Sequence, residues 1–265
     1  MIALGKECYH ENKGAIHGYG RKWSEDDLST ALCNEVASLV YDDAGNKHIQ
    51  SILEKVVTTD FDKTELEKAL AISDSIKDWQ VGEAIAESYL TQHCNCLFPW
   101  PDGRDVRRPK SSLPGADLVG YIGEQEETRF VFGEVKTSAE AKWPPQVCCG
   151  RSGTHGLGEQ VKDLCSDESI KSQIFKYLGG RADTSFEQFQ NATKHFLKDR
   201  NDVHIIGFLV RDVDPKSDDL KTLIKDISGI CPSKTMVEFF ALYLPNGKIK
   251  TLAETVVNAR NGGAA

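Results

Sequence analysis

The sequence predicts a mixed α/β fold in which helices flank a central sheet, and three observations lead to this prediction. Apolar runs of strand length occupy residues 117–122, 128–136, 203–210 and 236–244. Elsewhere, apolar residues recur at the three- and four-residue spacing of helices that bury one face. Helical and strand-like segments follow one another along the chain in the order of a layered α/β protein.

The N-terminal part of the chain predicts helices. Residues 1–22 are rich in Gly, His and Lys and show no clear period. We expect a helix from Ser24, because serine caps helices well and the three acids after it suit the positive end of the helix dipole. A second helix is expected over 47–57, where isoleucines and a valine share one face. We therefore predict an N-terminal helical region at residues 1–75.

Residues 76–265 are predicted to form the core of the protein. The strands at 117–122 and 128–136 are joined by a short turn that begins with Gly123, so they form a hairpin. The strand at 203–210 is apolar almost throughout, as expected for a strand buried on both faces. The other predicted elements are a helical region at 64–93 with a break near Asp78 or Gly82, a loop or lid at 137–158, helices at 157–178 with a break near Ser166, at 186–198 and at 218–227, and a strand at 236–244.

The composition argues against a membrane protein. None of the apolar runs approaches the roughly 20 residues that a membrane span needs. The first residues show no basic segment followed by an apolar core, so we expect a cytoplasmic protein without a secretory signal.

The net charge of −8 is unusual for a protein that holds DNA by itself. Either a local basic patch or a partner protein must then supply much of the contact with nucleic acid. One basic patch lies in the Pro- and Gly-rich loop before the predicted hairpin and consists of Arg104, Arg107, Arg108 and Lys110. By count alone, such residues are also typical of a solvated loop.

The eight cysteines are expected to be free thiols, because the chain is large and shows no sign of secretion. Zinc is the alternative, since residues 93–96 and 148–149 both contain neighbouring donors. Neither pair of cysteines has the two-residue spacer of a typical zinc knuckle, and adjacent cysteines rarely bind one tetrahedral ion.

Three charged residues of the predicted hairpin form the candidate catalytic group. Glu134 and Lys136 share one face of a strand, because side chains alternate along it. The chain reverses between Asp117 and Glu134, so the start of one strand lies beside the end of the other. The pattern predicts two carboxylates and an ammonium group at one edge of the sheet.

These groups fit the needs of phosphodiester cleavage. A hard cation such as Mg²⁺ (or Mn²⁺) takes oxygen ligands and keeps several waters, so Asp117 and Glu134 suffice to anchor it. Lys136 would orient the attacking water and offset phosphate charge. A third carboxylate from a helix, either Glu83 or Glu87, would complete the metal shell, and Gly82 would let that helix approach the sheet closely.

A surface ion pair between Glu134 and Lys136 is the competing interpretation. The neighbours of these residues in the strand are apolar, namely Phe130, Val131, Phe132 and Val135. Because charged residues are seldom buried without partners, this setting favours a functional site.

An Asp at a strand start followed by Glu-x-Lys on the next strand resembles the P-D-(D/E)-x-K nuclease superfamily. One departure is that Pro114 lies three residues before Asp117 instead of next to it. The resemblance implies a restriction-endonuclease-like αβββαβ core. Within the superfamily, Gly82-Glu83 on a helix, the segment at 115–119 and Phe132-Gly133-Glu134-Val135-Lys136 resemble the HamA family, the nuclease subunits of the Hachiman anti-phage defence system; the effector of the Abp defence system is similar too.

The HamA-like resemblance implies a function and a partner. The expected activity is a Mg²⁺-dependent, rather unspecific DNase, with Glu83 as the third carboxylate beside Asp117, Glu134 and Lys136. The expected partner is a superfamily 2 helicase that holds the nuclease inactive and senses DNA damage or phage DNA. The acidic balance of the chain is compatible with such a partner.

Some residues of the next helices are secondary candidates. Superfamily members often place a Gln where Gln160 lies, in reach of the water or phosphate. Lys162 and Lys171 would reach phosphate, and His155 in a Gly-rich loop would act as a general base. For each of them, an ordinary surface role is the alternative.

Two other functions remain open at this point. One is a catalytically silent nucleic-acid-binding or assembly subunit of a helicase complex, against which the presence of Asp117, Glu134 and Lys136 together argues. The other is a restriction-type endonuclease, for which 265 residues leave little room for a recognition module.

Overall fold

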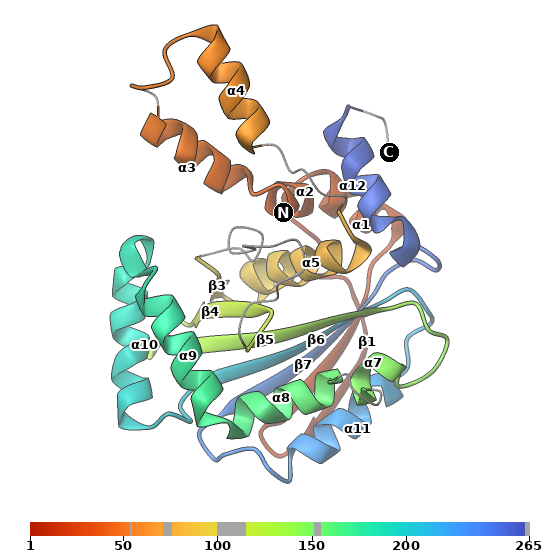
Figure 1. Cartoon of the computed structure of the whole chain (residues 1–265). Coiled ribbons are helices and arrows are strands. Elements are labelled where there is room, and N and C mark those ends of the chain that lie inside the picture. The colour runs from red at the N-terminus through yellow and green to blue at the C-terminus, as the bar shows by residue number, and fades with distance from the viewer. Residues whose placement is uncertain (54, 71–75, 100–114, 151–154, 263–265) are drawn as a thin grey trace.

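The computed structural model describes residues 1–53, 55–70, 76–99, 115–150 and 155–262. In these residues the fold is a seven-stranded mixed sheet with helices on both faces (Figure 1). The predicted mixed α/β fold with a central sheet flanked by helices is therefore confirmed. No helix of the described part is long and apolar enough to cross a membrane.

The strands follow the order β1-β2-β7-β6-β5-β4-β3 across the sheet. The central strands β5, β6 and β7 are parallel to one another, and β2 is parallel to β7. The outer pairs β1–β2, β3–β4 and β4–β5 are antiparallel. The strands are β1 (Lys6–Lys13), β2 (Ile16–Lys22), β3 (Cys96–Leu97), β4 (Leu118–Ile122), β5 (Arg129–Ser138), β6 (His204–Arg211) and β7 (Met236–Tyr243).

The helices divide between the two faces of this sheet (Figure 1). One face packs against α1 (Glu25–Cys33), α2 (Glu35–Val40), α5 (Asp78–His93) and α12 (Leu252–Arg260). The other face packs against α7 (Gln146–Cys149), α8 (Leu157–Ser166), α9 (Glu168–Gly179), α10 (Phe186–Lys198) and α11 (Asp218–Ile227). Two more helices, α3 (Asp43–Leu53) and α4 (Asp60–Leu70), stand away from the sheet (Figure 1).

Alternation along β5 decides which side chains meet which layer. Val131 and Val135 point into the layer that contains α5, whereas Phe130 and Phe132 point into the layer that contains α8 to α11. Both layers are apolar and fully covered, which explains the nearly continuous apolar runs of the central strands. Glu134 shares the parity of Phe130 and Phe132 and therefore faces the α8 layer.

Several predicted element boundaries are confirmed. Ser24 caps α1 and forms a capping box with Asp27. The predicted break near Ser166 separates α8 from α9, where Asp167 caps the second helix. The long helical region predicted at 64–93 is broken before Asp78, and α11 has the predicted bounds.

The N-terminal region needs a correction. Residues 6–22, which belong to the predicted helical region 1–75, form the hairpin β1–β2. Ile16 to Lys22 pair with Val237 to Tyr243 of β7, so this hairpin is part of the main sheet. The signal is weak in the sequence because β1 is largely exposed, and glycines take the places of large apolar residues in β2.

The predicted loop at 137–158 is partly ordered by a buried arginine. Arg211, fully buried, donates to the carbonyl oxygens of Glu140 and Lys142, at 2.9 Å in each case. Trp143 donates to the carbonyl of Asp214, and the ammonium of Lys216 lies 3.6 Å from the centre of a Trp143 ring. These contacts fix the chain that leaves the end of β5.

Candidate active site

The β4–β5 hairpin brings Asp117 beside Glu134 and Lys136. Leu118 pairs with Gly133 in this antiparallel hairpin. Asp117, which precedes Leu118, therefore lies beside Glu134, which follows Gly133. The Asp117 carboxylate accepts a hydrogen bond of 2.8 Å from the backbone N–H of Val135. This bond fixes the carboxylate against β5, as the spacing predicted.

One ammonium group bridges the two carboxylates. Lys136 Nζ lies 3.5 Å from Asp117 Oδ2 and 3.4 Å from Glu134 Oε2. The Glu134 side chain is only 3% exposed, whereas Asp117 and Lys136 are about one-fifth exposed. The group is therefore a partly buried cluster with two acids and one base, and not a solvated surface pair.

The cluster favours a neutral Glu134 in the metal-free protein. Burial is the main cause and the charge of Asp117 the second, and together they raise the pKa of Glu134 to about 9. Lys136 opposes this shift. Hydrogen bonding with the Asp117 side chain also contributes to the raised pKa of Glu134. A divalent cation is the natural replacement for the proton of a neutral Glu134, because metal binding requires deprotonated carboxylates.

A cavity of about 250 Å³ opens beside these carboxylates. Its described lining comes from the segment before β4, from β5, and from α8 and α9. The lining residues are Gly115, Ala116, Asp117, Glu134, His155, Gln160, Asp163 and Ile170. This volume is large enough for a hydrated cation and a phosphate group, but small beside a typical drug-sized pocket.

Gly115 positions the segment that carries Asp117. Its φ of +101° lies in the left-handed region, and a Cβ there would come within 2.7 Å of Ile170 on α9. Both features require glycine. The chain can thus pass close to α9 and deliver Asp117 to the start of β4.

Gln160 on α8 has an unsatisfied acceptor. Its Oε1 atom is buried and finds no hydrogen-bond partner among the described residues. Because a buried acceptor without a partner costs about 1–3 kcal/mol, this oxygen fits a role toward a bound ion or its water. The sequence-based candidate Gln160 is thus brought to the cavity that Asp117 and Glu134 line.

The donors present fit a hard divalent cation. Two carboxylates and one amide oxygen are the ligands that Mg²⁺ or Mn²⁺ accepts, with waters in the remaining positions. Within the described residues, no three His, Cys, Asp or Glu side chains are grouped so as to hold a metal ion. The fit therefore rests on the pair Asp117 and Glu134, and the zinc alternative finds no cluster there.

Helix α5, which carries the predicted third carboxylate, packs on the face of the sheet opposite to Glu134. Gly82 does allow α5 to approach the sheet, since a Cβ there would come within 2.0 Å of Thr137 Oγ1. Thr137 lies on the face of β5 opposite to Glu134 and Lys136. In the described part of the chain, Glu83 and Glu87 do not line the cavity. Their role at the metal stays a prediction.

Asp163 is the cavity carboxylate that the sequence reasoning missed. It lies on α8 three residues after Gln160, so both face the same side of the helix. Its side chain is about half exposed, and its Oδ2 lies 4.0 Å from His155 Nδ1. His155 itself is 72% exposed and also approaches Glu159 at 3.7 Å. The signal available in the sequence was the spacing Gln-x-x-Asp on the helix after the Glu-x-Lys strand.

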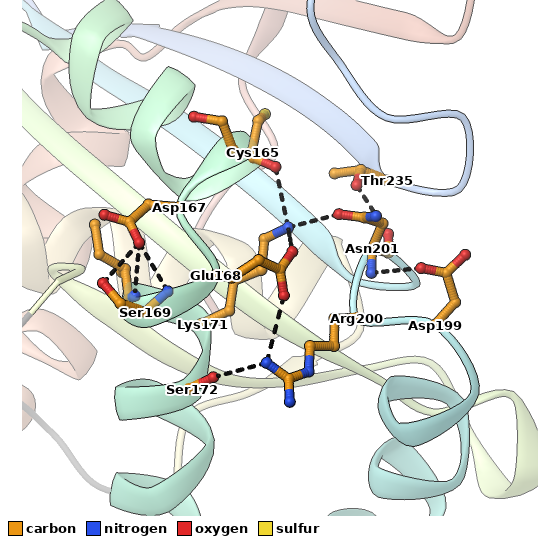
Figure 2. A network of polar contacts seen from close by, with 12 residues as sticks. Cys165, Asp167, Glu168, Ser169, Lys171, Ser172, Asp199, Arg200, Asn201 and Thr235 are labelled. Atoms are coloured by element: carbon orange, nitrogen blue, oxygen red, sulfur yellow. Dashed lines mark hydrogen bonds and ion pairs between the residues drawn. The ribbon is translucent and has the colours of Figure 1, made fainter.

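Lys171 is not available for phosphate, which corrects the sequence-based suggestion. Its side chain is fully buried, and its ammonium donates to the Cys165 carbonyl, to Asn201 Oδ1 and to Glu168 Oε1 at 3.0, 2.7 and 3.4 Å (Figure 2). The half-exposed Arg200 lies 3.7 Å from the Glu168 carboxylate (Figure 2). Lys171 thus ties the α8–α9 junction to the segment before β6. Lys162 on α8 is exposed.

The basic patch Arg104, Arg107, Arg108 and Lys110, together with Pro114, lies outside the described residues. The geometry therefore neither includes these residues in the site nor removes them from it.

Comparison of the chain with protein-family models and with curated proteins gave no match.

Proposed function

We propose that this protein is a divalent-metal-dependent nuclease that hydrolyses phosphodiester bonds of DNA. The observation that carries the proposal is the buried pair Asp117 and Glu134, bridged by Lys136 and open to a cavity. A divalent cation would replace the proton on Glu134 and offset the charges of the two ionised carboxylates.

Each side chain has a role in this proposal. Asp117 and Glu134 would hold Mg²⁺ or Mn²⁺, and Gln160 Oε1 would supply a further oxygen donor. The bound metal supplies charge stabilisation and an acidified water. Lys136 holds the attacking water or a non-bridging phosphate oxygen in place, and it loses little freedom because two carboxylates already orient it.

The element order supports a restriction-endonuclease-like core. Helix α5 precedes the antiparallel strands β3, β4 and β5, which are followed by helices α7 to α10 and then by β6, parallel to β5. This order is compatible with the αβββαβ core that the resemblance to the P-D-(D/E)-x-K superfamily implies. The HamA-like role extends the proposal: the chain would act as the DNase effector of an anti-phage system together with a superfamily 2 helicase.

Plasmid cleavage by the purified chain with Mg²⁺ or Mn²⁺ tests this proposal, with the variants Glu134→Gln and Lys136→Ala. We expect both to lower the cleavage rate by about 10²-fold or more. Lys225→Ala is the matched control, because Lys225 is an exposed lysine on α11, outside the described lining of the cavity. Variants that cleave as fast as the parent would remove the assigned site.

Metal binding provides a second measurement that does not depend on turnover. Titration of Mn²⁺ followed by electron paramagnetic resonance should show one site that Asp117→Asn and Glu134→Gln weaken. If the parent binds Mn²⁺ but cleaves only in the presence of a helicase subunit, the partner is required for activity. Equal Mn²⁺ binding by parent and both variants contradicts the metal assignment.

A further inference from the structure

The helices α3 and α4 project from the body of the protein (Figure 1). Only Gly45 is buried in α3, and none of the eleven residues of α4 is buried. Most helices of globular proteins are stabilised by packing of an apolar face, so such exposure is unusual.

These helices and the turn between them expose a row of large apolar side chains. Ile49, Ile52 and Val56 are 40%, 62% and 70% exposed, and Phe61 at the start of α4 is 73% exposed. Ile49, Ile52 and Val56 follow one another at intervals of three and four residues, and the N–H of Val56 bonds to the carbonyl of Leu53 in a further helical turn. Ile49 and Ile52 therefore share one face of α3, and Val56 lies in the turn that follows the helix. An apolar group of this kind, surrounded by polar residues, typically marks a protein–protein contact.

The base of the projection is fixed. Arg260 of α12 makes two hydrogen bonds to the Asp43 carboxylate, at 3.0 and 2.8 Å, and its guanidinium lies 4.9 Å from the centre of the Tyr41 ring. A bidentate pair of this kind is directional. It holds α3 at a defined place on the body while the apolar row stays open.

The charges of α4 indicate which partner fits. The helix carries four acids and two lysines, and both lysines pair within the helix: Lys63 with Asp60 at 3.3 Å, and Lys68 with Glu65 at 2.8 Å. Asp62 and Glu67 therefore leave α4 with net negative charge. The whole chain also has a net charge of −8, so charge repulsion disfavours a second copy of this chain or DNA as the occupant of this surface.

The size of the apolar row also argues against a dimer of this chain. Four partly exposed side chains provide only part of the roughly 800 Å² that each partner buries in a stable interface. They are instead sufficient for a hot-spot cluster, in which a few apolar anchors enter a groove on a larger partner.

We propose that residues 43–53 and 55–70 form a docking arm for a nucleic-acid-binding protein that presents an apolar groove rimmed by Lys and Arg. The arm inserts Ile52, Val56 and Phe61 into this groove, and the acids of α4 meet the basic rim. This proposal rests on the proposed function in one respect: the partner supplies the contact with DNA that an acidic nuclease lacks.

Site-specific photo-crosslinking tests the docking arm. The photoreactive residue p-benzoylphenylalanine replaces Phe61 in one full-length version of the protein and Phe186 in another, and each is expressed in the cells that naturally make the protein. Phe186 is the matched control, because it is a phenylalanine of similar exposure, 61%, on α10. We expect a discrete adduct from position 61 only, and mass spectrometry should identify a basic, nucleic-acid-binding protein in it.

Affinity measurements with that purified protein complete the test. We expect the double variant Ile52→Ser/Val56→Ser to weaken binding about 10-fold or more, since two hot-spot anchors are removed. Glu67→Lys should weaken binding several-fold, and the effect should shrink at high salt. All of these side chains are exposed, so the melting temperature should stay unchanged.

Four results overturn the docking arm: no adduct specific to position 61, an adduct between two copies of this chain, an adduct with an acidic protein, or equal affinity of parent and arm variants. Mn²⁺ binding and crosslinking together separate this failure from failure of the nuclease proposal. Arm variants leave Mn²⁺ binding at Asp117 and Glu134 intact, whereas Glu134→Gln leaves the adduct at position 61 intact.

Discussion

Two lysines of this protein, Lys136 and Lys171, both contact acidic side chains but lie in different surroundings. Lys171 is fully buried, and three fixed oxygen atoms accept from it (Figure 2). Lys136 is 22% exposed, lies 3.4 and 3.5 Å from two carboxylates, and borders a cavity. A buried ammonium group whose hydrogen bonds are all made within the chain supports the fold. An ammonium group that lies between two carboxylates beside a cavity is suited to bind a ligand.

The largest expected effect concerns catalysis at Lys136. Replacing it by Met should lower the rate of metal-dependent DNA cleavage by about 10²- to 10³-fold, or about 3–4 kcal/mol of transition-state stabilisation. Stability should change by less than about 1 kcal/mol, because Glu134 already takes up a proton to relieve the repulsion. Single-turnover cleavage and urea denaturation give the two quantities. A large loss of stability would assign Lys136 the same role as Lys171.

Lys171→Met should show the opposite pattern. We expect a loss of about 3 kcal/mol in the free energy of unfolding, because Asn201 and the Cys165 carbonyl lose a buried donor. Urea denaturation measures it, with Lys162→Met as the control for an exposed lysine nearby. Metal affinity should be retained in the protein that remains folded. The comparison between the two lysines breaks down if the stability of this variant equals that of the parent.

The stability of the metal-free protein should depend on pH through Glu134. The pKa of Glu134 in the folded protein, about 9, lies above the ordinary value of 4.5. The contribution of Glu134 to the free energy of unfolding is therefore fully present below about pH 4.5 and is lost as the pH rises through about 9. Glu134→Gln lacks this titration, and at pH 9 we expect it to be more stable than the parent by about 1–3 kcal/mol. Added Mg²⁺ should narrow the difference by stabilising only the parent. If the free energies of unfolding of the parent and of Glu134→Gln change in parallel from about pH 5 to about pH 9, Glu134 is not buried beside Asp117 as described.

The smallest expected effect concerns Gly115. Gly115→Ala introduces a Cβ against Ile170 at a φ of +101° and should cost about 1–2 kcal/mol of stability. Because Gly115 leads into Asp117, Mn²⁺ affinity should fall as well. Gly247→Ala is a useful control, since its φ of +78° is also left-handed but no atom lies within 4 Å of the added Cβ. If both variants lose the same stability and neither loses Mn²⁺ affinity, contact with Ile170 does not position the site.

The local part of the fold was readable from the sequence. Helix periodicity and capping residues predicted α8, α9 and α11, because these signals lie within a few residues of one another. The hairpin β1–β2 was not readable, since β2 depends on pairing with β7 at the other end of the chain. The helix α12 was also missed, as was the short strand β3.

The candidate site shows the same division. Asp117, Glu134 and Lys136 were found because strand alternation and one hairpin suffice to bring them together. Asp163 was missed and the setting of Lys171 was misjudged, since both depend on how α8 and α9 pack against the sheet. A single sequence does not show which side of a helix faces a distant strand.

The parallel pairing of β2 with β7 has a consequence for synthesis. Ile16 leaves the ribosome early and pairs with Val237, which leaves it late. Until then, β2 has only β1 beside it, and a two-stranded hairpin is marginally stable by itself. Completion of the sheet is therefore a late, non-local step, and such steps are slow. A ribosome that stalls before β7 releases a chain whose N-terminal strands lack their place in the fold.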